Sequence, residues 1–173
     1  ELHHRTRVLL YATDFYDQIE RSIVPALRAG FIVLADRYTL TLMSRATSRG
    51  LAKDYMEGLY RYAPQPDLRL RLDISPRTAF NRLFSAKQAL SHFEFGGDLQ
   101  LGDSVFDSFV RYQNRLRQEF ASFGDRMGYH QVHGERSVPE VNEELRSEIA
   151  MTLGIEDIRY TPSAALRSIW EQG

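Results

Sequence analysis

The chain has 173 residues, enough for one domain with a buried core and too few for two comfortable ones. Apolar residues make up 43%, charged residues 26%, and the formal net charge is −1, so composition favours neither a nucleic-acid partner nor a membrane partner. No cysteine is present, which excludes disulfides, thiolate nucleophiles and zinc–thiolate sites. We also find no membrane-length apolar run and no signal-like opening segment, and therefore expect a cytoplasmic protein.

The first 40 residues predict a long helix followed by a buried strand. Helical spacing of apolar side chains indicates a helix over residues 6–28, which Pro25 bends and Gly30 ends. Residues 31–35, FIVLA, are apolar and partly β-branched, which is typical of a strand covered on both faces in a parallel sheet.

The rest of the chain alternates between helical and strand patterns. PDLRLRLDIS is a strand pattern because leucines alternate with polar residues, and Pro66 and Pro76 bound it. Asp103 is a candidate N-cap for a long amphipathic helix. The other predicted elements are helices over 51–62, 76–90, 137–154 and about 164–170, and a strand in YHQVHG at 129–134.

Strands separated by helices predict an α/β fold with a parallel sheet in a three-layer α/β/α arrangement. We expect one domain over residues 1–154 and a C-terminal tail over 155–173. Ligands of such sheets bind at the carboxyl ends of the strands, which is where Asp36 and Arg37 would lie. An arginine there can grip a phosphate with two hydrogen bonds, and an adjacent aspartate can hold magnesium through water. As a bare tripeptide, Asp-Arg-Tyr is more typical of a buried structural salt bridge than of a phosphate site.

An ordered series of segments resembles the thymidylate kinases. It runs from RVLLYATDFYDQIERSIVPALRAGFIVLADRY through SRGL and QPDLRLRLDISPRTAFNRL to HGERSVPEVNEELRSEI, and it spans most of residues 7–152. The resemblance implies a P-loop NTPase kinase fold that transfers the terminal phosphate of ATP to a nucleoside monophosphate with Mg²⁺. The resemblance is also compatible with a homodimer, since members of the family commonly pair through helices.

The resemblance also implies roles for individual residues. Arg37 would clamp the acceptor phosphate, and Asp36 would help to place the metal ion. Tyr11 would stack on the acceptor base. The other implied positions are Phe15, Tyr38, Arg45, Arg49 and Phe93 around the acceptor, Lys87 and Glu94 in a lid, and Arg136 and Ser137 near the donor adenine.

Three departures separate this chain from the family pattern. The phosphate-binding loop Gly-x-x-x-x-Gly-Lys-Ser/Thr does not occur in the 173 residues, so we expect the sheet's first strand and that loop to precede Glu1. Phe15 stands where the family has an arginine that reads the pyrimidine. Arg45 and Ala46 replace a Tyr-Gln pair, with an apparent one-residue deletion before SRGL, and Phe93 replaces a tyrosine near the sugar. These changes predict an acceptor other than typical dTMP.

Two hypotheses of different classes follow from these features. The first is a nucleoside monophosphate kinase of the thymidylate kinase type. The second is a non-catalytic nucleotide-binding or regulatory module that keeps the architecture without the chemistry. A shared α/β scaffold without shared function is a third reading.

Overall fold

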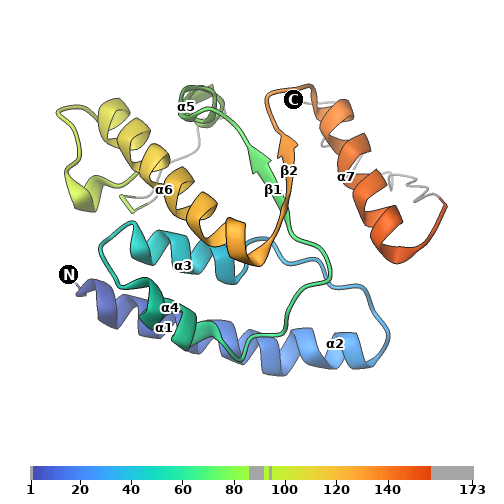
Figure 1. Ribbon diagram of the computed structural model, residues 1–173. Coiled ribbons are helices and arrows are strands. Elements are labelled where there is room, and N and C mark those ends of the chain that lie inside the picture. Colours follow the sequence, from blue (N-terminus) through green and yellow to red (C-terminus); the bar gives the residue numbers. More distant parts are fainter. Residues whose placement is uncertain (1, 86–91, 94, 157–173) are drawn as a thin grey trace. The chain divides into compact units, whose positions relative to one another are not determined.

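The computed structural model describes residues 2–85, 92–93 and 95–156 (Figure 1). They fall into two compact units. The helical unit comprises residues 1–66 and 74–129, and the strand unit comprises residues 67–73 and the chain from 130 onward. The helical unit contains α1 (His4–Gln18), the π-helix η1 (Ile19–Ile23), α2 (Val24–Arg28), α3 (Thr39–Thr47), α4 (Lys53–Tyr60), α5 (Pro76–Ser85), the 3₁₀ turn η2 (Gly97–Leu99) and α6 (Val105–Met127). The strand unit contains β1 (Leu70–Asp73), β2 (His130–His133) and α7 (Val138–Leu153).

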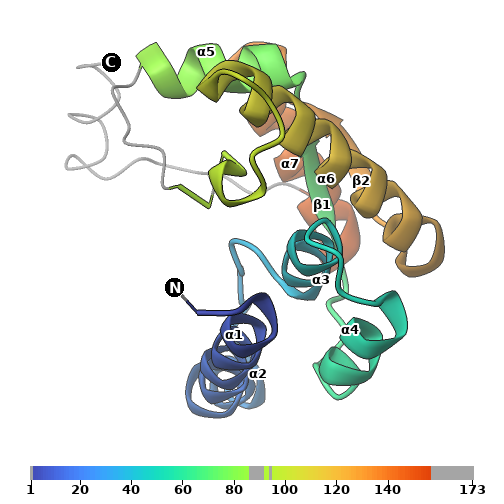
Figure 2. The ribbon, with the colours of Figure 1, turned by 90° about the vertical axis from the view of Figure 1, so that its left-hand side faces the viewer.

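The predicted helix over 6–28 is confirmed as one rod made of α1, η1 and α2. Figure 2 views it nearly end-on, with α2 behind α1. The π-helical turn ends two residues before Pro25, whose missing N–H group removes one regular helical hydrogen bond and favours a local rearrangement of the hydrogen-bond ladder. The rod ends as predicted at Gly30, whose φ of 82° lies in the left-handed region that glycine enters without strain.

The strand predicted at residues 31–35 is wrong, because this segment forms no ladder. Within the described residues the sheet consists of β1 and β2 alone, and a strand exists only where a neighbour accepts and donates its backbone hydrogen bonds. The segment is exposed and not buried: Phe31, Ile32 and Leu34 are all open to solvent, Leu34 to 87%. Asp36 and Arg37 therefore follow an exposed apolar segment.

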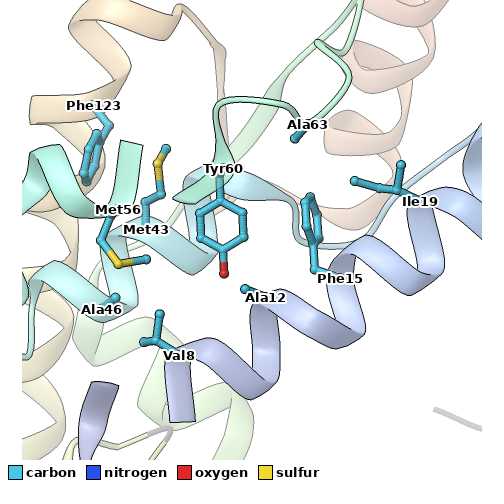
Figure 3. Close-up of a cluster of buried hydrophobic side chains, with 10 residues drawn as sticks. All are labelled: Val8, Ala12, Phe15, Ile19, Met43, Ala46, Met56, Tyr60, Ala63 and Phe123. Carbon is cyan, nitrogen blue, oxygen red and sulfur yellow. The ribbon is translucent and has the colours of Figure 1, made fainter. Parts of the chain in front are cut away.

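The core of the helical unit lies where α1, α3, α4 and α6 meet. In both ribbon views α3 lies between α1 and α6 (Figures 1 and 2). Figure 3 shows the ten buried side chains of this cluster: Val8, Ala12, Phe15, Ile19, Met43, Ala46, Met56, Tyr60, Ala63 and Phe123. Met56 and Phe123 are fully buried, and burial of such a side chain contributes about 1.5–3 kcal/mol relative to exposure.

The strand unit pairs β1 with β2 in parallel, with Leu70 opposite His130 and Asp73 opposite His133. This confirms two of the three predicted strands and their parallel direction. The helix predicted at 137–154 is confirmed as α7, which begins with a capping box between Ser137 and Glu140 and ends at Gly154 in a left-handed conformation. The hydrogen bonds from Ser137 lower the pKa of the Glu140 carboxyl.

One further sequence prediction needs correction, and two others concern residues that the structure describes only in part or not at all. The N-cap of α6 is Ser104 and not Asp103, because the Ser104 hydroxyl accepts the Asp107 backbone N–H at 3.0 Å. The helix predicted over 76–90 is described as far as residue 85, and the helix predicted around 164–170 lies outside the described residues. None of the described helices is long and apolar enough to cross a membrane.

Candidate functional site

The Asp36-Arg37-Tyr38 sequence turns the chain from the exposed segment 31–35 into α3. Asp36 and Arg37 are exposed, and the Arg37 backbone has a φ of 69°. This left-handed conformation is strained for a residue with a Cβ atom, and such strain is often found at functional sites. Tyr38 is the N-cap residue of α3, and its hydroxyl donates a hydrogen bond to the Pro64 carbonyl at 3.0 Å. The hydroxyl of Tyr38 thus fixes the end of a turn that exposes both neighbouring charges.

The backbone strain at Arg37 can be measured with two variants that both remove the guanidinium. Arg37→Gly should be more stable than Arg37→Ala by about 0.5–1 kcal/mol, because glycine adopts φ 69° without a steric penalty and loses part of this gain to its freer unfolded chain. Urea denaturation of the two variants measures the difference. Equal free energies of unfolding would show that this turn is not left-handed in solution.

Tyr11 and Phe15 lie one turn apart on α1 and have opposite environments. Tyr11 is 53% exposed, whereas Phe15 is 8% exposed and belongs to the core cluster (Figure 3). The Phe15 ring centroid lies 5.0 Å from that of Tyr38 and 5.3 Å from that of Tyr60. Burial raises the pKa of the Tyr60 hydroxyl, as expected in this apolar setting. Tyr11 is therefore accessible to a planar ligand, and Phe15 packs in the core.

Arg49 joins three parts of the helical unit through one hydrogen-bond network. Its Nε donates to Asp98 Oδ2 at 2.8 Å and its Nη2 to Asp98 Oδ1 at 3.0 Å. The same Nη2 donates to the Phe93 carbonyl at 2.8 Å. Nη1 donates to the Arg45 carbonyl at 3.2 Å and to the hydroxyl of Tyr112. The network brings together three predicted site residues: Arg45, Arg49 and Phe93.

The Arg49–Asp98 pair is shielded from water, with side chains that are 10% and 4% exposed. Burial alone would raise the pKa of Asp98, but its hydrogen bond and charge interaction with Arg49 outweigh this and lower it. Burial likewise acts to lower the pKa of Arg49, and the contacts with Asp98 and Tyr112 raise it instead. Both groups therefore stay charged across the neutral pH range.

The side chain of Phe93 lies against α1. The guanidinium carbon of Arg7 is 3.6 Å from the centre of the Phe93 ring, and Arg7 Nη2 donates to the Leu2 carbonyl at 3.3 Å. A cation over an aromatic face is attracted by the ring quadrupole. Phe93 is thus held by its carbonyl group on one side and by its ring on the other.

Comparison with known proteins identifies the family. The sequence profile described as Thymidylate kinase matches residues 1–127. The chain belongs to the thymidylate kinase family. The fold of this family is the P-loop kinase α/β fold, and the parallel pair of β1 and β2 with its connecting helices is consistent with it.

Named relatives carry the same family description. A protein named probable thymidylate kinase 2, from Saccharolobus solfataricus, is 30% identical over 139 residues, which are 80% of this chain and 65% of the relative. A probable thymidylate kinase from Thermococcus kodakarensis is 25% identical over 157 residues, 90% of this chain and 70% of the relative. The thymidylate kinase of Xanthomonas oryzae pv. oryzae is 33% identical over 97 residues, 56% of this chain and 43% of the relative. The chain thus spans less than two thirds of the first and third of these relatives.

The residues expected near the donor adenine belong to the strand unit, and both take part in its internal contacts. Arg136 forms an ion pair with Glu144, and its Nε donates to the His133 carbonyl at 3.2 Å. Ser137 caps α7. Their role toward a donor stays a prediction. Lys87 and Glu94, expected in the lid of a thymidylate kinase, lie outside the described residues.

Asp36 is the residue that we expect to help place a magnesium ion, through water. No group of three or more His, Cys, Asp or Glu side chains suited to a metal ion occurs in residues 2–85, 92–93 and 95–156. Magnesium in phosphoryl-transfer sites needs no such cage, because one or two carboxylates suffice when substrate phosphates and water complete the coordination. The exposed carboxylate of Asp36 fits this donor set.

Two residues of the Arg49 network were missed by sequence reasoning. Asp98 lies in GGDLQLGD, which reads as a glycine-rich loop, and Tyr112 lies within the amphipathic pattern of α6. Neither has a local sequence signal that separates it from a surface acid or a core tyrosine. Only the fold brings them to Arg49, from 49 and 63 residues away in sequence.

Proposed function

We propose that the protein is a nucleoside monophosphate kinase that transfers the terminal phosphate of ATP to an acceptor other than typical dTMP. The observation that carries the proposal is Arg37, exposed by a strained left-handed turn at the start of α3 in a chain of the thymidylate kinase family. An exposed guanidinium in this position can make a bidentate contact with a phosphate.

In the proposed reaction, an oxygen of the acceptor phosphate attacks the terminal phosphorus of ATP. The bond from that phosphorus to the bridging oxygen breaks, which yields ADP and a nucleoside diphosphate. Arg37 orients the acceptor phosphate and offsets its charge, which is the main task of a protein in phosphoryl transfer. Asp36 would hold Mg²⁺ through water, and the bound ion would neutralise charge on the phosphates.

The choice of acceptor rests on the residues around α1. Tyr11 is the exposed aromatic surface on which we place the base by stacking. Phe15 carries no hydrogen-bond donor and packs in the core, so it offers no polar readout of a pyrimidine edge. Tyr38, Arg45 and Phe93 are the further residues that we assign to the acceptor pocket.

A second function is favoured by a different observation. Phe15, Arg45 and Phe93 depart from the acceptor-pocket pattern of the family, and such losses suit a module that binds a nucleotide without converting it. A nucleotide-binding or regulatory module without catalysis would need only the residues around Arg37. Turnover by the full-length protein separates the two functions.

The test is turnover of the full-length protein with Mg²⁺ and ATP on dTMP, dUMP, dCMP, dAMP and dGMP, measured as ADP formation. We expect phosphorylation of at least one monophosphate without a preference for dTMP. A clear dTMP preference would refute the acceptor assignment. Nucleotide binding by calorimetry without any turnover would favour the non-catalytic module over the kinase.

A further inference from the structure

The donor inventory of Arg49 shows how this residue can and cannot act. A guanidinium carries five N–H groups. In the structure one goes from Nε to Asp98, two go from Nη1 to the Arg45 carbonyl and Tyr112, and two go from Nη2 to Asp98 and the Phe93 carbonyl. No N–H group of Arg49 is left for a phosphate or a base.

From this inventory we infer that Arg49 is a positioning residue of the acceptor pocket, which fixes the backbone of Arg45 and Phe93 without touching the acceptor. This inference rests on the proposed function, because it takes Arg45 and Phe93 as residues of that pocket. It differs from the role that the family resemblance implies for Arg49, which is contact with the acceptor itself.

The network is built to be rigid. Hydrogen bonds between charged groups are stronger away from water, and the Arg49–Asp98 pair is largely shielded. The segment that carries Asp98 also packs tightly on α6: a Cβ atom at Gly96 would lie 2.6 Å from Cγ of Tyr112. Ser108 adds a hydrogen bond from its hydroxyl to the Gly96 carbonyl at 3.2 Å. The carbonyl group of Phe93 is therefore held by a guanidinium that is itself fixed on two sides.

Placement of this kind matters for a transferase, because a displacement of about 1 Å in a positioned group can cost about 100-fold in rate. Loss of Arg49 would release the Phe93 carbonyl and the Arg45 carbonyl together. Arg45 lies in α3, before Arg49 in the sequence, and Phe93 lies after Arg49, in the segment before η2. Arg49 is thus the link that sets their mutual distance.

The test uses Arg49→Lys and Asp98→Asn in the full-length protein, with Arg21→Lys as the matched control. A lysine keeps the charge but cannot make the two parallel hydrogen bonds to Asp98. Arg21 pairs with Asp17 on the surface, with side chains 79% and 55% exposed, so the same replacement there should be silent. Each variant is measured by hydrogen exchange of the amides in residues 92–93 and 95–98, and by steady-state kinetics with ATP and the best acceptor.

We expect faster exchange of these amides in both network variants, an increase of about tenfold in the KM for the acceptor, and a KM for ATP within about twofold of the wild type. Equal losses for both substrates, or faster exchange with an unchanged acceptor KM, would reduce Arg49 to a purely structural role. A raised acceptor KM without a change in exchange would mean direct contact with the acceptor. Either result overturns the inference.

A milder variant covers the case in which the buried substitutions fail to fold. Tyr112→Phe removes one of the acceptors of Arg49 and keeps the Asp98 pair, so it should shift exchange and acceptor KM in the same direction by about two- to threefold. The inference fails if this folded variant matches the wild type in both measurements. A wild-type protein without turnover on any monophosphate refutes the proposed function and the acceptor role together, while the exchange data still report whether Arg49 holds the segment.

Discussion

Replacement of Arg37 by alanine is expected to lower kcat/KM for the acceptor monophosphate by about 10²–10³-fold and to leave the KM for ATP within about threefold of the wild type. The reason is that the guanidinium supplies two charge-assisted hydrogen bonds to the acceptor phosphate, which strengthen as charge builds up during transfer. Arg37 is exposed, so its removal costs little folding stability. Steady-state kinetics with each substrate varied in turn gives both constants.

Two further variants make this result specific. Arg37→Lys keeps the positive charge and loses the fork geometry, so we expect its kcat/KM to lie between those of the wild type and Arg37→Ala. Arg21→Ala removes a different exposed arginine, one that lies on the rod of α1, η1 and α2, and should leave both constants unchanged. Parallel losses for ATP and the acceptor in Arg37→Ala would instead assign Arg37 a general structural role.

Local sequence patterns predicted most of the helices and both of the strands found in the described residues. Apolar spacing predicted the rod over residues 6–28 and the helix over 137–154, because this signal depends only on residues a few positions apart. The prediction of a strand at 31–35 was wrong because a strand depends on distant residues and not on local ones. A strand depends on a partner, and the described residues offer this segment none.

Helix α3 was not predicted from the sequence. Thr39–Thr47 is rich in threonine and serine, residues that favour caps and turns over helix interiors. The helix forms because Met43 and Ala46 bury in the core cluster between α1 and α6, a gain that outweighs weak propensity (Figure 3). Burial against distant residues is invisible to a local pattern.

The candidate site shows the same contrast between features that a local motif predicts and contacts that only the fold brings about. Asp36 and Arg37 were singled out by a motif, and the structure leaves both exposed. No local motif could show that Arg49 donates hydrogen bonds to Asp98 and Tyr112, since sequence spacing carries no information on pairs 49 and 63 residues apart. The family resemblance implied an acceptor-site role for both arginines, and only their contacts in the structure distinguish them.

Phe15→Arg is expected to destabilise the protein by several kcal/mol and not to restore recognition of thymidylate. The position is 8% exposed and surrounded by the rings of Tyr16, Tyr38 and Tyr60. An arginine there would lose the packing of a phenyl ring, worth about 3 kcal/mol, and would bury a charge without a carboxylate partner among these rings. Since a domain is stable by about 5–15 kcal/mol, much of the protein would unfold at moderate temperature.

The matched control is Tyr11→Arg, which introduces the same side chain one turn earlier on α1 at an exposed position and should change the free energy of unfolding by less than about 0.5 kcal/mol. Urea denaturation followed by circular dichroism measures both variants against the wild type. The contrast between them follows from burial alone, because the helix and the new residue are identical. If Phe15→Arg were as stable as Tyr11→Arg and gained a preference for dTMP, residue 15 would line an open acceptor pocket, and the core assignment of Phe15 would be wrong.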